Sequence, residues 1–201
     1  MASKTEICNM TLSHLGIGSE IANVDTERSS EAQACRRFFD ECRNATLEDY
    51  NWSFARKFAT LNLVEETPIE DWLYSYRYPV DCVRARRILS GSPDESRQDR
   101  INFIVGKDSA GRLIYTNQET AELEYTEKVT DPSFYPSAFS LALSFRLAAY
   151  CAPRLTKGDP FKLKAEMLVQ YELEINRAER NDVNSQQDFE EAESAFIRAR
   201  S

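Results

Sequence analysis

The spacing of apolar residues changes twice along this chain, and that change constrains the fold more than any other feature. Apolar residues recur at helical spacing in 4–15 and 30–50, alternate as in strands from about Lys57 to Val129, and return to helical spacing after Pro132. We therefore expect an α+β fold that is mainly helical. Helices from both ends should form a four-helix bundle, with an inserted antiparallel β sub-domain and an extended C-terminal tail.

Capping signals indicate where the first two helices begin and where the first one ends. Ser3 and Glu6 fit a capping box, in which each side chain bonds the other residue's backbone N–H, and Ser30 and Gln33 fit a second one. Gly16 fits the position just after a helix end, where a left-handed backbone is common. These signals predict helices at about 4–15 and 30–50.

The helical segment 134–152 is apolar on nearly every side. Its main stripe recurs at helical spacing, and Leu143 and Leu147 nearly cover the opposite side. A helix of this kind belongs in the centre of a bundle, because it has no face suited to water. The Gly-Asp-Pro sequence at 158–160 ends this segment and begins the last long helix.

The central segment contains short strand-like stretches separated by turn residues. Turn residues gather at 91–94 and at 108–111. The stretches are rich in β-branched and aromatic residues, and we expect them to form one antiparallel sheet. They are Phe58–Val64, Trp72–Tyr78, Val83–Leu89, Ile101–Val105, Arg112–Tyr115 and Ala121–Val129.

These patterns divide the chain into four parts. The N-terminal bundle helices occupy 1–56, the β sub-domain 57–130, the C-terminal bundle helices 131–182 and a tail 183–201. Apolar residues recur at helical spacing in the tail, which has nothing local to pack on. The tail is either a frayed terminus or a segment that docks onto a partner.

Bulk composition disfavours several functions. The 201 residues carry a net charge of −8, which argues against sequence-independent DNA binding, because that binding needs Lys and Arg to displace counterions. Five cysteines without a Cys-x-x-Cys make a zinc ribbon improbable, and we expect buried thiols in a reducing compartment. We expect no signal peptide, because the N-terminus is charged and lacks an apolar run. We expect no membrane span, because the longest apolar stretch, 138–153, is too short and contains Arg146.

No motif for nucleotide, metal or nucleophilic chemistry is present. The single histidine, His14, cannot form a metal site alone. Gly16 and Gly18 follow a helix, whereas a dinucleotide-binding loop follows a strand. The chain has neither a phosphate-binding P-loop nor a Gly-x-Ser-x-Gly elbow. We therefore expect no cofactor and no metal.

Paired carboxylates leave one enzymatic alternative open. Glu122 and Glu124 are two residues apart in a predicted strand, so their side chains share a face. Glycoside hydrolysis uses two carboxyl groups about 5–10 Å apart. The alternative function is therefore a peptidoglycan hydrolase that uses these paired carboxylates, set against a solvated sheet face with no chemistry.

One basic and aromatic cluster lies in the centre of the chain. Arg84 and Arg86 alternate onto one face of a predicted strand, close in sequence to Arg77 and to Tyr74 and Tyr76. Such a cluster fits contacts between subunits, and it also fits a nucleic-acid platform through Tyr76, Arg84 and Arg86. Neighbouring acidic residues dilute the charge and favour the first of these readings.

Several motifs, in their order and spacing, resemble one protein family. The chain is similar to the tail tubular protein A-like head-to-tail adaptors of short-tailed bacteriophages over about residues 5–182. The most specific piece is Tyr76-Arg77-x-Pro79-x-Asp81-Cys82. The others are Ile7-Cys8-Asn9-Met10-x-Leu12-x-x-Leu15-Gly16, Ser30-Glu31-Ala32 with Cys35 and Phe39, Leu47 leading into Trp52-x-Phe54-Ala55-Arg56 with Leu61 behind, and a proline-marked start at Asp131 to Pro136.

The resemblance implies a structural virion protein, made in the host cytoplasm, with no enzymatic role. Such adaptors form a twelve-fold ring beneath the portal protein and carry the tail nozzle or tail tube. Genomic DNA passes through the lumen during packaging, retention and ejection, without specific binding. The resemblance makes Phe189, Ala192, Phe196 and Ile197 candidates for portal docking. Candidates for the ring or tail interface are Tyr74, Tyr76, Arg77, Arg84 and Arg86.

Overall fold

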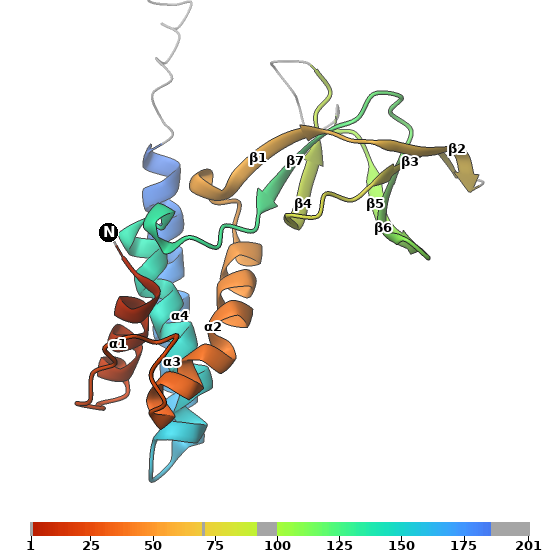
Figure 1. The fold of residues 1–201 in the computed structure, drawn as a ribbon. Helices are drawn as coiled ribbons and strands as arrows, with labels where there is room; N and C mark the ends of the chain where they lie inside the picture. The colour runs from red at the N-terminus through yellow and green to blue at the C-terminus, as the bar shows by residue number, and fades with distance from the viewer. Residues whose placement is uncertain (1, 70, 92–99, 186–201) are drawn as a thin grey trace, which may run out of the picture.

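The chain is a mixed α+β protein, as its changing apolar period predicts (Figure 1). The computed structural model describes residues 2–69, 71–91 and 100–185. The described residues form four α-helices, seven strands and two short 3-10 turns. The helices are α1 (Lys4–His14), α2 (Ser30–Asp49), α3 (Ser137–Leu155) and α4 (Pro160–Ser185).

The helix ends follow the capping signals with one shift. The Ser3–Glu6 capping box is confirmed in both directions, and Gly16 has the left-handed φ of +71° expected after a helix end. The second prediction is displaced by one residue. The side chain of Ser29, not Ser30, accepts a hydrogen bond from the Ala32 N–H at the start of α2.

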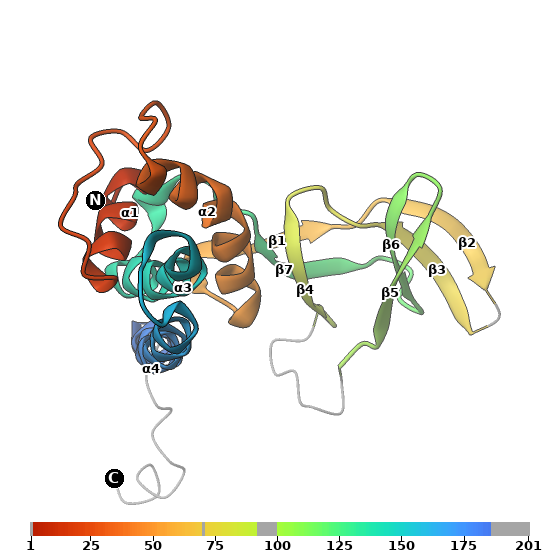
Figure 2. The same ribbon diagram turned by 90° about the horizontal axis from the view of Figure 1, so that it is seen from below.

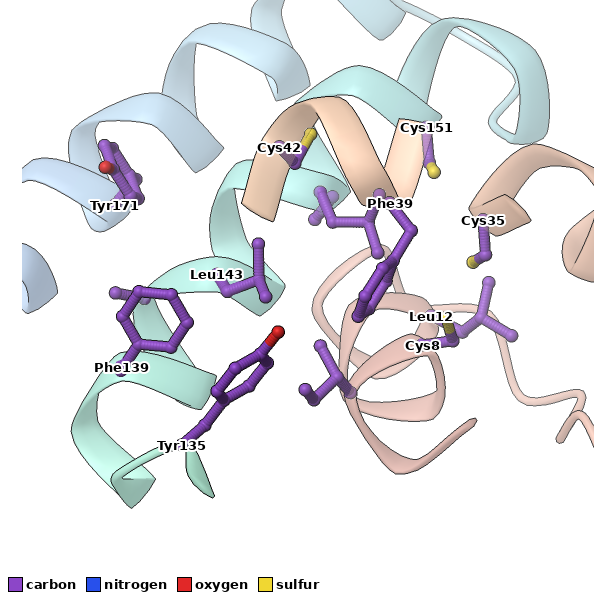
Figure 3. Close-up of a cluster of buried hydrophobic side chains, with 14 of the residues drawn as sticks. Cys8, Leu12, Cys35, Phe39, Cys42, Tyr135, Phe139, Leu143, Cys151 and Tyr171 are labelled. Atoms are coloured by element: carbon purple, nitrogen blue, oxygen red, sulfur yellow. The ribbon is translucent and has the colours of Figure 1, made fainter. Parts of the chain in front are cut away.

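Helix α3 occupies the centre of the helical part, because it is the helix with the least polar surface. It packs against α1, α2 and α4, as both ribbon views show (Figures 1 and 2). Side chains of Phe139, Leu143 and Leu147 are fully buried in this contact. Figure 3 shows Phe139 and Leu143 near Phe39 of α2 and Tyr171 of α4, with Leu12 of α1 across the core.

The prediction of one sheet is wrong, because the described residues form two. A three-stranded antiparallel sheet has the order β1-β7-β4, and a four-stranded one has the order β2-β3-β6-β5. The strands are β1 (Arg56–Thr60), β2 (Leu63–Ile69), β3 (Trp72–Arg77), β4 (Cys82–Ile88), β5 (Phe103–Asp108), β6 (Gly111–Thr116) and β7 (Glu122–Glu127).

The predicted strand Phe58–Val64 is divided at Leu61 and Asn62, where the chain passes from one sheet to the other. The side chain of Leu61 turns inward and is 6% exposed. It joins a second apolar cluster to which both sheets contribute. The buried members of this cluster are Leu61, Tyr76, Tyr78, Cys82, Ile88, Ile114, Ala121, Leu123 and Tyr125.

One of the two predicted turns can be compared with the structure in full. Strands β5 and β6 form a regular hairpin in which Asp108 pairs with Gly111, and Gly111 has a φ of +141° that favours glycine. Of the other turn, Gly91 has a φ of +77°, and 92–94 lie outside the described residues.

Candidate functional site

The β part meets the helical part at the carboxyl end of α2, and Arg86 of β4 forms this junction. The Arg86 guanidinium donates hydrogen bonds to the main-chain carbonyls of Leu47, Glu48 and Tyr50, at 3.1, 3.1 and 2.5 Å. Its Nε donates to the Thr126 hydroxyl at 2.8 Å. The last carbonyls of a helix have no partner within the helix and carry partial negative charge, so a cation here stabilises the end of α2.

Arg84 reaches the same helix end from the same face of β4. Its guanidinium donates to the Glu48 carbonyl at 2.9 Å, and the side chain is otherwise exposed. The last turn of α2 contains no basic residue of its own. Arg84 and Arg86 supply that charge from another element, so the basic cluster seen in the sequence has a structural use within one chain.

Aromatic packing holds the other side of the junction. Trp52 is 1% exposed and donates its indole N–H to the Thr46 carbonyl at 2.9 Å. Phe139 of α3 lies edge-to-face with Trp52 and with Phe54, at ring-centroid distances of 5.1 and 5.0 Å. The tryptophan follows α2 and the chain enters β1 at Arg56, so these rings lie where helix gives way to sheet.

The C-terminal helix is tied to the same place. Asp182 of α4 is 8% exposed and accepts hydrogen bonds from the main-chain N–H of Ser53, at 3.1 Å, and from the Ser53 hydroxyl. Ser53 begins a 3-10 turn, η1 (Ser53–Ala55), between α2 and β1. Asp182 therefore satisfies a backbone donor of this turn, a contact that no local sequence signal reveals.

A second polar group ties three helices together near the same end of α2. Arg146 of α3 donates to the Asp49 carboxylate at 2.5 Å and to the Tyr171 hydroxyl at 2.8 Å. Tyr171 of α4 also donates its hydroxyl proton to Asp49. Burial and this hydrogen bond both raise the pKa of Tyr171. The group explains why one arginine interrupts the apolar face of α3.

The predicted interface residues Tyr74 and Tyr76 face inward. Tyr76 is 2% exposed, and its hydroxyl donates to the carbonyls of Gln118 and Glu119 at 2.8 and 2.5 Å. Tyr74 is half-buried, and its ring centroid lies 6.4 Å from that of Tyr76. Residues two apart in a strand share a face, and here the shared face is the one that covers the second core.

Arg77 lies on the opposite face of β3 and is more accessible. Its guanidinium forms a two-pronged pair with Asp108, at 3.0 and 2.9 Å, at the end of the β5–β6 hairpin. The hydrogen bond from Arg77 lowers the pKa of Asp108 to about 2, and Asp108 in turn raises that of Arg77. This side chain is already paired within the chain.

Asp81, in the segment Tyr76-Arg77-x-Pro79-x-Asp81-Cys82, also belongs to a network of polar side chains. Lys57 of β1 donates to Asp81 at 2.6 Å and to Glu127 at 2.9 Å. Tyr125 of β7 donates its hydroxyl proton to Asp81 at 3.0 Å, and burial followed by this bond raises the pKa of Tyr125 to about 12. The motif thus holds the β3–β4 connection against β1 and β7.

The paired carboxylates do not share an environment. Glu122 is exposed, whereas Glu124 is 3% exposed and is contacted by Asn51, Arg87 and Arg56, at 2.7, 2.5 and 3.3 Å. Burial works against ionisation of Glu124, but the hydrogen bonds and nearby guanidinium charges outweigh it and lower its pKa. A general acid needs a raised pKa, so Glu124 has the wrong electrostatics for that role.

The thiols and the histidine have structural surroundings. All five cysteines are buried and free, as expected of small hydrophobic side chains, and Figure 3 shows four of them around the helical core. Burial raises the pKa of Cys42 to about 12. His14 stacks on Phe145 with centroids 3.8 Å apart, and burial lowers its pKa. Within the described ranges, no cluster of potential ligands could hold a metal ion.

The four predicted portal-docking residues, Phe189, Ala192, Phe196 and Ile197, lie outside the described residues. Across 2–69, 71–91 and 100–185, no helix combines the length and apolarity needed to cross a bilayer. Known protein families and curated proteins offer no further guide, because no family model matches this chain and no curated protein matches it.

Proposed function

We propose that this chain is a structural virion protein, the subunit of a head-to-tail adaptor ring, and not an enzyme. The observation that carries the proposal is the junction between the two parts. Arg86 of β4 fixes the β part onto the end of α2, and Trp52 and Asp182 fix the α2–β1 connection against the helices. A subunit that bridges two assemblies needs a β part held in a fixed position relative to its helices. An enzyme instead needs a cleft lined by polar groups that are not already bonded within the chain.

The arrangement around α3 supports the bundle expected of such adaptors. Three helices pack on α3, and helices from both ends of the chain contribute to one core. We propose that this four-helix bundle faces the portal protein. The C-terminal tail, with Phe189, Ala192, Phe196 and Ile197, is the proposed docking segment, and the β part faces the tail nozzle or tail tube.

A ring of about twelve subunits closes through a heterologous contact, in which each copy presents two different surfaces. Its lumen would continue the DNA channel. The net charge of −8 per subunit supports passage of DNA without adhesion, because sequence-independent binding needs basic groups that release counterions.

Size-exclusion chromatography with light scattering tests the proposal on the full chain. Alone and in dilute solution, the protein is expected to be monomeric or polydisperse. With purified portal rings of the same virus, it should elute as a complex with about one copy per portal subunit. A chain that remains a monomer in both conditions would contradict the adaptor function.

A further inference from the structure

The two sheets leave a groove between β4 and β5. Each of these strands is the last in its own sheet, and among the described residues no further strand pairs with either edge. A single bridge between Ile88 and Ile101 joins them at one end. Beyond the bridge lies a groove of about 340 Å³, lined by Glu48, Tyr78, Val83, Arg84, Ala85, Val105 and Arg112.

Two guanidinium groups in this groove have no carboxylate partner. Arg112 stacks on Tyr78, with its guanidinium carbon 3.9 Å from the ring centroid, and Arg84 donates to the Glu48 carbonyl at 2.9 Å. In the described part of the chain, no carboxylate lies within salt-bridge distance of either group. Both are held in place without being neutralised, which is the arrangement that favours an incoming carboxylate.

The groove also has an apolar lining. Val83, Ala85 and Val105 contribute it, and Val105 is 42% exposed although it lies in a strand. The Tyr78 hydroxyl accepts a hydrogen bond from the Ala85 N–H at 3.2 Å, so this part of the β4 edge is already satisfied. A segment that binds in this groove therefore has to contribute acidic and apolar side chains. Backbone hydrogen bonds to this part of β4 would add little.

A surface that carries exposed acidic and apolar side chains lies elsewhere on the same chain. The β2–β3 hairpin projects away from β4 and from the helices, as the two views show (Figures 1 and 2). It exposes the carboxylates of Glu65 and Asp71 and the side chain of Leu73, which is 52% exposed. Neither carboxylate has a salt-bridge partner among the described residues.

We infer that the groove between β4 and β5 receives the β2–β3 hairpin of a second copy of this chain. Glu65 and Asp71 of one copy meet Arg84 and Arg112 of the next, and Leu73 covers the apolar lining. The two surfaces lie on different sides of the β part, so the contact is heterologous and repeats from copy to copy. This inference rests on the proposed ring and names the surfaces that join its subunits.

Charge reversal in the full chain tests the contact. The groove variant is Arg84→Glu/Arg112→Glu, and the hairpin variant is Glu65→Lys/Asp71→Lys. Arg112→Glu alone is a second groove variant, because Arg84 also supports α2. Arg154→Glu/Lys157→Glu, in exposed residues near the α3–α4 turn, is a control with the same charge change as the groove variant. Sedimentation velocity from about 1 to about 500 µM measures self-association, and circular dichroism checks folding.

Each variant alone is expected to lose at least about tenfold in association constant, while the control keeps the wild-type value. An equal mixture of the groove and hairpin variants should recover the wild-type association, because every contact in an alternating assembly is again between opposite charges. Two results would overturn the inference. One is a wild-type chain that stays monomeric at every concentration, and the other is association that charge reversal leaves unchanged. In both cases the adaptor function is judged separately, by binding to portal rings.

Discussion

The helical part has a continuous apolar core from α1 to α4, whereas the β part has a smaller core and depends on charged side chains where it meets α2. Around α3 the buried groups are mainly Leu, Phe, Ala and Cys. At the junction the half-buried Arg86 places its guanidinium on the end of α2, and the buried Glu124 has arginines on two sides. The helical part is therefore held mainly by apolar burial, whereas the contact between the β part and α2 is held mainly by hydrogen bonds and charge.

The largest expected effect comes from the buried ring of Trp52, in the connection between the two regions. Trp52→Ala removes a fully buried ring and should lower the free energy of unfolding by about 3–5 kcal/mol. Urea denaturation followed by circular dichroism measures it. Trp52→Phe is the matched control, since it keeps an aromatic ring but loses the N–H bond to Thr46 and part of the indole volume. A Trp52→Ala cost below about 1 kcal/mol would show that the rings do not join the two regions.

Removing the cation at the junction should cost less. Arg86→Met keeps the apolar stem and removes the donor to the carbonyls of Leu47 and Tyr50, whereas Glu48 keeps its bond from Arg84. It is expected to lower the free energy of unfolding by about 2 kcal/mol. Hydrogen exchange should quicken at the end of α2 and in β4 while the α1–α3 contact keeps its protection. Arg86→Lys separates charge from geometry, because a lysine cannot reach all three carbonyls at once. Uniform exchange across both regions would contradict the comparison.

The contribution of Glu124 to the stability of the β part should depend on pH. Its pKa is lowered in the folded chain, so its ionised form stabilises the fold above the ordinary carboxyl range and that contribution is lost as the pH falls through the folded pKa. Glu124→Gln should cost about 1–2 kcal/mol at pH 7 and progressively less below about pH 4.5. Thermal unfolding of both proteins between pH 3 and 7 checks this. If the difference in stability between the two proteins grows as the pH falls, the pKa of Glu124 is not lowered in the folded chain and the prediction is wrong.

The smallest effect is expected at the exposed ion pair. Arg77→Ala breaks the two bonds to Asp108 at the surface, where solvent competes for both charges. The unfolding midpoint should change little, and the small difference should shrink further in 0.5 M salt. Asp108→Asn serves as the reciprocal control. A midpoint loss comparable with that of Arg86→Met would mean that surface and junction charges are equally important.

The sequence predicts the helices well because their signals are local. Capping at Ser3 and the left-handed Gly16 are confirmed, and the apolar surface of α3 correctly indicates its central place. The division into two sheets is missed, since alternation gives the period of a strand and not its partner. Tyr76 is misassigned for the same reason, because the pattern does not say which face is buried.

The use of Arg84 and Arg86 depends on a distant contact, yet one signal points to it. The last turn of α2 lacks a basic residue, so its end carbonyls are open to a cation from another element. The ties through Asp182 and through Tyr171 span well over a hundred residues of sequence and have no local signal. Contacts of this kind follow from the packing of α4 on α3, which no periodicity specifies.

Electron microscopy of the full chain bound to portal rings of the same virus tests the central proposal most directly. The account predicts an added ring with the portal's rotational symmetry, its helices against the portal and its β parts pointing away. Portal rings without added density, or with isolated copies that do not touch one another, would contradict it.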